Sequence, residues 1–507
     1  MTQKSSILGG ALLLTASNLL LRLISIGFNV FLTERIGAAG LGLLQLISTV
    51  GVFAILAGTG GIRIASMCLA AEEFGHRRLG GVRLAVSTCL RGGLMVSSLT
   101  GAALFFLAVP VADVLLQDIR AAASLRVIGL TLPFSCLCGI MTGYFTACSR
   151  IRRLVATEIA ERLLSVLLTA VLLLIWVGND LSRACLAITL GSSLGTIFDF
   201  FLLYFIFRRD MRHTAPKGSR SVMDRRLLRL CVPIALNDLL RAGLNSAEQL
   251  LIPFGLARFS GSSEAAMASY GTIHAMVFPI MMFPAAILYS VSDLLVPELS
   301  RSRAMGRRLR IVDLSEKCLR LTMVFSCAVA GLLFLNAYSL SRNTYSSEEA
   351  GYFLRCFSPV VVMLYLDAIT DGMLKGLAEQ VSCVRINTLT SLLDVVFLFL
   401  LLPRWGIGGY LFSFIVTHAI NLFLSLRRLL RSGECRPGVR DLLMPPACAL
   451  LALLPTSALS SHAILRSAIF LLLLSALYLL FQALSPYDFR WVRRVMRRSI
   501  DRKPRSG

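Results

Sequence analysis

The sequence of 507 residues contains no polar stretch long enough to fold as a soluble domain. It also has no phosphate-binding Gly-x-x-x-x-Gly-Lys loop and no nucleophile elbow, which are signatures of P-loop ATPases and of many hydrolases. We therefore expect neither an enzyme nor an ATP-driven pump, and we expect no cofactor. Any transport must then draw on ion gradients, on the membrane potential or on withdrawal of the substrate.

The 13 cysteines are scattered, mostly within apolar segments. Cys136 and Cys138 form the only close pair, and no histidine or second cysteine pair stands at the spacing of a zinc site. A free cysteine behaves as a small apolar residue. The sequence therefore predicts no metal site.

Acidic residues are also few, with 28 Asp and Glu against 51 Lys and Arg and a net charge of +23. The basic residues gather in every second connection between apolar segments. Cytoplasmic loops of membrane proteins show this pattern, so both termini are predicted to be cytoplasmic. Because anionic headgroups of membrane lipids explain the basic loops, we expect no nucleic-acid partner. The basic connections lie near residues 76–83, 150–153, 208–229, 301–310, 427–440 and 490–505.

Apolar residues are abundant, making up 56% of the chain, and apolar runs of about 20 residues recur throughout. The first run is too long for a signal-peptide core and has no clear cleavage site after it, so we expect it to be retained. These runs predict an all-α integral membrane protein of about fourteen transmembrane helices. The expected spans are 7–32, 39–61, 86–116, 124–148, 154–177, 183–207, 229–256, 267–297, 313–340, 351–378, 383–403, 407–429, 440–459 and 464–485.

A single long polar connection divides the predicted helices into two halves of six, and two extra helices follow. We expect the halves to form pseudo-symmetric lobes because an intramembrane motif recurs in both, as argued next. The expected organisation is an N-terminal lobe (1–207), a basic cytoplasmic linker (208–228), a C-terminal lobe (229–432), helices thirteen and fourteen (433–485) and a basic cytoplasmic tail (486–507).

The first helix of each predicted half carries an arginine deep within its apolar segment. Residues 18–22 read Asn-Leu-Leu-Leu-Arg, and residues 237–241 read Asn-Asp-Leu-Leu-Arg. A charge at that depth costs about 2.5–3.5 kcal/mol on insertion scales, so it usually faces a polar cavity or a partner. The repeat therefore predicts a duplicated transporter with a positively charged interior site for an anion.

Helical spacing extends each arginine into a polar stripe. We expect these stripes to bind the substrate, although each arginine has an alternative role as the partner of a buried carboxylate such as Asp199 or Asp394. The first stripe contains Asn18, Arg22, Ser25 and Asn29. The second contains Asn237, Arg241 and Glu248 with Asn245 beside it, so Asp238 and Glu248 are competing partners for Arg241.

Further polar residues lie within the apolar segments. Glu158 and Arg162 are one helical turn apart, which favours a local ion pair. Asn387 and Asn421 are expected to make interhelical contacts. Four acids are candidates for carrying a coupling H⁺ or Na⁺, with interhelical hydrogen bonding as an equal alternative: Asp199, Glu248, Asp394 and Glu161.

Several short motifs are spread along nearly the whole chain: Arg22–Asn29 followed by Arg35–Ala38, Gly143–Phe145, Leu295–Leu299 and Gly372–Leu377. These motifs resemble those of the multidrug/oligosaccharidyl-lipid/polysaccharide (MOP) exporter superfamily. Within it, the likeness is to the polysaccharide biosynthesis and stage V sporulation protein B group, which is related to MurJ-type lipid II flippases.

The resemblance implies fourteen helices in two lobes around a cavity whose arginines hold a lipid-linked pyrophosphate. The chain departs from the pattern twice. Phe28 and Asn29 stand where a second basic residue is common, and Arg63 stands where a proline is expected. Arg63 is therefore a candidate for a relocated cationic contact at the cytoplasmic mouth.

We thus expect a flippase of the cell membrane that moves a lipid-linked oligosaccharide or peptidoglycan precursor to the outer leaflet by alternating access. Its expected partners are the anionic glycan lipid, membrane lipids, a coupling ion or the membrane potential, and enzymes of envelope synthesis. Cell-wall and spore-cortex synthesis are both open. The alternatives are a cation-coupled multidrug exporter of the same superfamily and a non-transporting scaffold for envelope assembly.

Overall fold

The computed structural model describes residues 4–76, 78–148, 150–176, 180–212, 214–215, 219–433, 435, 438–457 and 462–482. The predicted tail 486–507 and the side chain of Asn18 lie outside this description. Every regular element in the described residues is a helix. Nine of these helices are long and apolar enough to cross a membrane. The all-α membrane architecture expected from the sequence is confirmed.

The described chain forms two compact units. The N-terminal unit contains Leu12–Ala257 and Ser262–Gly271, and the C-terminal unit contains Arg258–Gly261, the described residues from Thr272 onward and the start of the first helix. This division falls after the seventh long helix, whereas the sequence prediction divides the lobes before it. That residues 229–432 form a single C-terminal lobe therefore stays a prediction.

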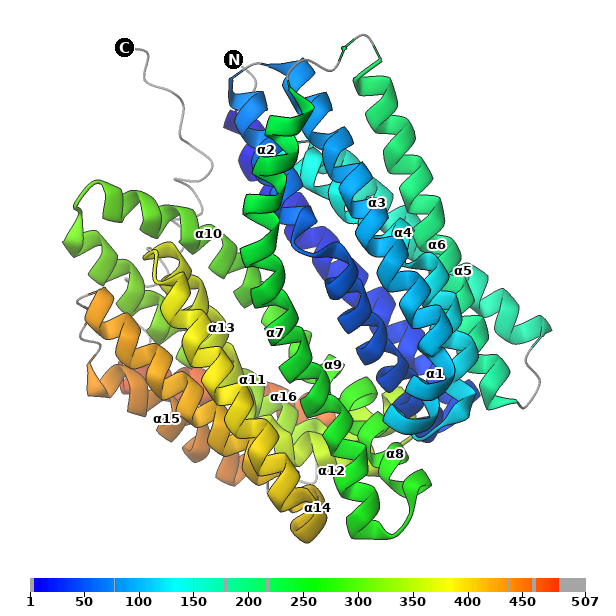
Figure 1. Cartoon of the computed structure of the whole chain (residues 1–507). Coiled ribbons are helices and arrows are strands. Elements are labelled where there is room, and N and C mark those ends of the chain that lie inside the picture. Colours follow the sequence, from blue (N-terminus) through cyan, green and yellow to red (C-terminus); the bar gives the residue numbers. More distant parts are fainter. Residues whose placement is uncertain are drawn as a thin grey trace. The chain divides into compact units, whose positions relative to one another are not determined.

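The N-terminal unit is built mainly of long helices, several of which run side by side in Figure 1. The first contains Gly37 with φ 67°, a left-handed conformation that favours glycine and divides this helix into two spans. The elements are α1 (Lys4–Thr59), α2 (Ile62–Gly75), α3 (Leu79–Pro110), η1 (Val111–Leu115), η2 (Ile119–Ala121), α4 (Ala122–Ala147), α5 (Ile151–Ile175), α6 (Leu181–Asp210), α7 (Arg220–Ser260) and α8 (Ser263–Gly271).

The C-terminal unit also has a long helix with a kink at a glycine. Gly406, with φ 54°, divides the longest helix of this unit into two spans. Separating α1 and α14 at their kinks accounts for four of the predicted spans. The elements are η3 (Thr272–Val277), α9 (Phe278–Met282), α10 (Ala285–Ala304), α11 (Arg308–Tyr345), α12 (Glu348–Phe357), η4 (Ser358–Val360), α13 (Val361–Gly376), α14 (Gln380–Ser432), α15 (Val439–Ser457) and α16 (Ala463–Leu480).

Small residues let neighbouring helices approach closely. A Cβ atom on Gly129 of α4 would stand 2.7 Å from the carbonyl oxygen of Gly101 of α3, which leaves no room for a side chain. Residues 191–195 read Gly-Ser-Ser-Leu-Gly, the letters of a nucleophile elbow, but they lie inside α6 rather than at a strand-to-helix turn. A Cβ on Gly195 would stand 2.9 Å from Ser165 Cβ of α5, so this sequence serves helix packing.

The connection between α6 and α7 is shorter than the predicted linker 208–228, because α7 already begins at Arg220. Met223, Leu227 and Cys231 are spaced one turn apart and are buried in the core of the N-terminal unit. Asp224 accepts a hydrogen bond from Arg91 of α3 at 2.9 Å. Burial of each large apolar side chain stabilises this packing by about 1.5–3 kcal/mol. The apolar stripe therefore holds the start of α7 on α3 and its neighbours.

The last two helices pack along α11 (Figure 1). Asn336 of α11 donates a hydrogen bond to Ser467 Oγ of α16 at 2.8 Å, and the Tyr478 hydroxyl donates to the Val324 carbonyl oxygen at 3.2 Å. The Phe470 ring fills the space left by Gly331. These contacts fix α16 to the C-terminal unit.

Candidate functional site

The predicted stripe of α1 lies against α5. Arg22, Ser25 and Asn29 are half-buried, and helical geometry puts them on one face. Arg162 of α5 donates a hydrogen bond to Ser25 Oγ at 2.8 Å, and the Ser25 hydroxyl donates to the Leu21 carbonyl oxygen at 2.8 Å. The structure thus brings a second arginine to this stripe, whereas the sequence predicts that Arg162 pairs with Glu158.

The predicted local pair of Glu158 and Arg162 is wrong. Arg162 interacts electrostatically with Glu161 instead, and Glu158 interacts with Arg63 of α2. The stem of Arg63 passes over Gly139 of α4, with its carbons 3.7–3.9 Å from the position of a Cβ there. The absence of a side chain at Gly139 therefore lets Arg63 lie close to α4 with its charge near α5.

Asp199 of α6 completes this polar cluster. It interacts electrostatically with Glu158 and Glu161 and lies beside the Cys138 thiol and the Thr157 hydroxyl. Its Oδ1 atom is buried and has no hydrogen-bond partner in the described part of the chain. Carboxylates that share a site repel one another when all are ionised, so a bound proton or cation stabilises such a cluster. Of the predicted site residues, Arg63, Glu161 and Asp199 are brought together here.

Arg241 lies at the middle of α7 with its side chain exposed. Among the described residues, no hydrogen bond or ion pair engages its guanidinium, so Asp238 and Glu248 are not its partners. Asn237 is half-buried and Asn245 is exposed on the same helix. The second predicted stripe therefore presents an uncompensated cation.

The turn between α1 and α2 packs against α7 just before this stripe. Gly60 and Gly61 have φ values of 47° and 72°, which favour glycine. A Cβ on Gly61 would stand 2.8 Å from Ile234 Cγ2 of α7, so a larger residue would also clash. This close approach places α2, which carries Arg63, next to the helix of Arg241.

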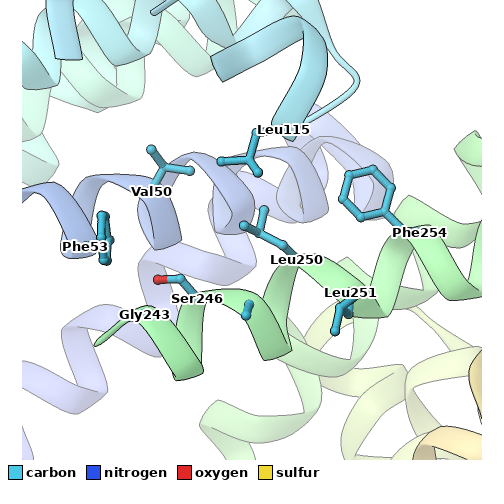
Figure 2. A pocket seen from close by; sticks show the side chains of 9 residues that line it. Val50, Phe53, Leu115, Gly243, Ser246, Leu250, Leu251 and Phe254 are labelled. Carbon is cyan, nitrogen blue, oxygen red and sulfur yellow. The ribbon is translucent and has the colours of Figure 1, made fainter. Parts of the chain in front are cut away.

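A cavity of about 430 Å³ opens between α1, η1 and α7 (Figure 2). Ser246 contributes the only polar side chain of its lining, so the cavity suits hydrocarbon rather than charge. At about 100° per residue, these positions of α7 lie on a different side from Asn237 and Arg241. The predicted arginine does not line this cavity. Its lining residues are Val50, Phe53, Leu115, Gly243, Ser246, Ala247, Leu250, Leu251 and Phe254.

Asp394 of α14 is buried in the C-terminal unit. It accepts hydrogen bonds from Ser413 Oγ at 2.6 Å and from Thr417 Oγ1 at 3.1 Å. Both donors lie beyond the Gly406 kink, in the second half of α14. The carboxyl group is thus held by interhelical hydrogen bonds, which is the alternative role that the sequence predicts for it.

Two further acids in this unit were missed as functional candidates. Asn421 donates a hydrogen bond to Asp367 of α13, and Asn387 donates to Asp371 at 3.2 Å, which confirms the predicted interhelical role of both asparagines. The Oδ1 atom of each aspartate is buried without a hydrogen-bond partner in the described structure. The signal in the sequence was two acids one turn apart within an apolar segment.

Comparison with known proteins identifies the family. The family model described as "Polysaccharide biosynthesis protein" matches residues 7–303. The chain belongs to this family. Stage V sporulation protein B of Bacillus subtilis (strain 168) is 23% identical over 418 residues, which cover 80% of this chain and 79% of that protein.

Two solved structures share the fold. Lipid II flippase MurJ in an inward closed conformation aligns with a TM-score of 0.72 and 13% identity, over 93% of this chain and 98% of that one. An inward-facing multidrug resistance MATE family transporter of the MOP superfamily aligns with a TM-score of 0.61 and 16% identity, over 82% of this chain and 96% of that one. The predicted likeness to the polysaccharide biosynthesis group is confirmed, the fold is shared with a transporter of the MOP superfamily, and the chain is a multi-pass membrane protein.

Proposed function

We propose that the protein is a plasma-membrane flippase that moves a glycan linked through pyrophosphate to a polyprenyl lipid from the cytoplasmic to the outer leaflet. The observation that carries the proposal is Arg241, a cation halfway along α7, which the sequence predicts to cross the membrane, and it has no partner among the described residues. A charge there cannot face lipid cheaply, so it faces a polar cavity or an anion. Its planar fork suits phosphate oxygens.

The family supports this substrate class. The matching family model is described by polysaccharide biosynthesis, and one protein of the same fold is named a lipid II flippase. The likeness to stage V sporulation protein B favours a role in sporulation, and the lipid II flippase of the same fold favours a peptidoglycan precursor, in cell-wall or spore-cortex synthesis. The family model and the similar proteins both favour a lipid-linked glycan precursor as the substrate.

The chemistry of each candidate residue suggests which part of the substrate it contacts. Arg22 and Arg241 bind the pyrophosphate, and Arg63 makes the first cationic contact at the cytoplasmic mouth. The amides of Asn29, Asn237 and Asn245 contact the pyrophosphate or the sugars, and Asn18 joins them. The apolar cavity beside Phe53 suits the hydrocarbon chain of the same substrate.

Export of an anion is favoured by the membrane potential. With the inside negative, each negative charge that moves outward gains about 2.3 kcal/mol per 100 mV. We expect α1 and α7, the helices of Arg22 and Arg241, to approach each other when the substrate passage closes. The like charges of the two arginines oppose closure until an anion lies between them. Anionic substrate thus promotes the alternation between inward-open and outward-open states.

A coupling H⁺ or Na⁺ binds at the carboxyl clusters. Asp199 with Glu161 in the N-terminal unit is the first candidate, because an Asp199 oxygen is buried without a hydrogen-bond partner in the described structure. Asp367 with Asp371 in the C-terminal unit is the second, because these two carboxylates interact electrostatically. Asp394 and Glu248 remain candidates on sequence grounds. Each cluster is a place where a bound ion would relieve repulsion.

The proposal is tested in a deletion strain by lipid analysis. Loss of a flippase leaves its substrate in the inner leaflet, so the lipid-linked glycan should accumulate there, within reach of reagents added from the cytoplasmic side. Restoration of the wild-type gene should clear it. Normal levels of every lipid-linked glycan in the deletion strain, with normal envelope assembly, would exclude the proposed function.

A further inference from the structure

A second cavity, of about 320 Å³, lies at the basic end of α14. The kink at Gly406 folds α14 back on itself, so its first turn and its last turns meet there. Four of the seven lining residues are arginines, and Ile386 and Leu424 supply an apolar wall. The lining is Ser382, Arg385, Ile386, Leu424, Arg427, Arg428 and Arg431.

One of these arginines is already neutralised. Arg428 donates hydrogen bonds to both carboxylate oxygens of Glu379, at 2.8 Å and 2.7 Å. Ser382 and Ser432 donate to the same carboxylate at 2.8 Å and 3.2 Å. Glu379 therefore has little capacity left for another cation, and its contacts fix the rim of the cavity.

The other three arginines have no such partner. In the described part of the chain, no ion pair engages Arg385, Arg427 or Arg431. Arg427 and Arg431 are one turn apart on α14, and Arg385 faces the same cavity from the first half of that helix. Three like charges around one hollow repel each other unless an anion joins them.

We propose that this cavity binds the phosphate headgroup of an anionic membrane phospholipid. The cavity lies beside the two ends of α14, which is long and apolar enough to cross the membrane, so we expect the cavity at the depth of a headgroup. Guanidinium groups bind phosphate oxygens through paired hydrogen bonds, and the apolar wall suits the first carbons of an acyl chain. Basic pockets between membrane helices bind such headgroups in general. The inference is independent of the transported substrate.

The test uses the purified full chain, titrated with phosphatidylglycerol or phosphatidylcholine, with bound lipid counted by native mass spectrometry. The pocket variant combines Arg385→Gln, Arg427→Gln and Arg431→Gln. At about fivefold per arginine, we expect it to bind phosphatidylglycerol on the order of a hundredfold more weakly. A second variant, Leu424→Glu, keeps every arginine and places a carboxylate in the cavity. This variant should also lose the bound phosphatidylglycerol. If the first variant does not fold, the binding measured with the second variant tests the proposal.

The matched control removes the same charge at the end of α6, through Arg208→Gln, Arg209→Gln and Arg212→Gln. It should retain phosphatidylglycerol as the wild type does, and phosphatidylcholine should bind weakly throughout. Inorganic phosphate should not displace the lipid. Equal loss in the control, retention by both pocket variants, or displacement by inorganic phosphate alone would each overturn the proposal.

Discussion

Arg162 of α5 donates a hydrogen bond to Ser25 of α1, one turn from Arg22. The bond ties the helix that carries the first deep arginine to the helix that carries Glu161. A bond of this kind between a charged donor and a neutral acceptor contributes about 1.5–3 kcal/mol when half-buried. The bond therefore connects the helix of the carboxyl cluster with the helix of the arginine stripe.

The first prediction concerns this bond. Ser25→Ala removes the acceptor and leaves a half-buried guanidinium poorly satisfied, so we expect the free energy of unfolding to fall by about 1.5 kcal/mol. Thermal unfolding in detergent measures the change. Ser87→Ala is the matched control, because the Ser87 hydroxyl bonds only the Leu84 carbonyl oxygen of its own helix. Equal effects of the two variants would contradict the contact.

The second prediction tests close packing of α3 on α4. Gly129→Ala places a Cβ 2.7 Å from the Gly101 carbonyl oxygen, so we expect destabilisation of about 1–3 kcal/mol. A Cβ at Gly408 of α14 has nothing within 4 Å, so Gly408→Ala should be neutral or stabilising by up to about 1 kcal/mol. Unfolding in detergent compares the two. A harmless Gly129→Ala would show that the helices do not approach as described.

The third prediction concerns pH. Hydrogen bonds from Arg428 and Ser382 lower the pKa of Glu379, which lies outside the spanning helices, below its ordinary value of 4.5. A folded-state pKa that is lowered contributes stability above the unfolded value, and this contribution is lost as pH falls through the folded value. The melting temperature of the wild type should therefore exceed that of Glu379→Gln by a constant margin above about pH 5. The margin should shrink below pH 4.5, and a margin that grows there would contradict the prediction.

The fourth prediction separates the flippase from a multidrug exporter and tests coupling. We expect Asp199→Asn to make transport of the lipid-linked glycan independent of an imposed H⁺ or Na⁺ gradient, while substrate binding is retained. Vesicles with and without the gradient measure this. Drug susceptibility of cells that express the protein should stay unchanged. Broad resistance that Asp199→Asn abolishes would instead favour the cation-coupled exporter.

Hydropathy and charge predicted the helices well, because a bilayer demands long apolar helices whatever their partners. The repeated motif also identified Arg22 and Arg241, since a charge inside an apolar span stands out by itself. The contacts between polar side chains could not be predicted from the sequence. Arg162 donates a hydrogen bond to Ser25 and does not pair with Glu158, and Arg241 has no partner among the described residues. The rotation and packing of the helices decide which polar groups meet. Sequence spacing reports only neighbours on one helix.

The extent of α7 and the position of the apolar cavity escaped prediction for a similar reason. The residues that begin α7 are strongly basic, so they resemble a linker, yet Met223 and Leu227 bury against other helices and keep them helical. The cavity is enclosed by three separate elements, and no single segment signals it.

The central claim is that Arg22 and Arg241 together bind a lipid-linked pyrophosphate. Its most direct test is the transport of labelled lipid-linked pyrophosphate glycan across vesicles that contain the purified protein. Loss of two charged hydrogen-bonding groups, at about 1.5–3 kcal/mol each, should slow transport by at least about a hundredfold in the combined Arg22→Gln and Arg241→Gln variant. Arg301→Gln, at the exposed end of α10, should transport like the wild type. Transport that is unchanged in the double variant would contradict the account.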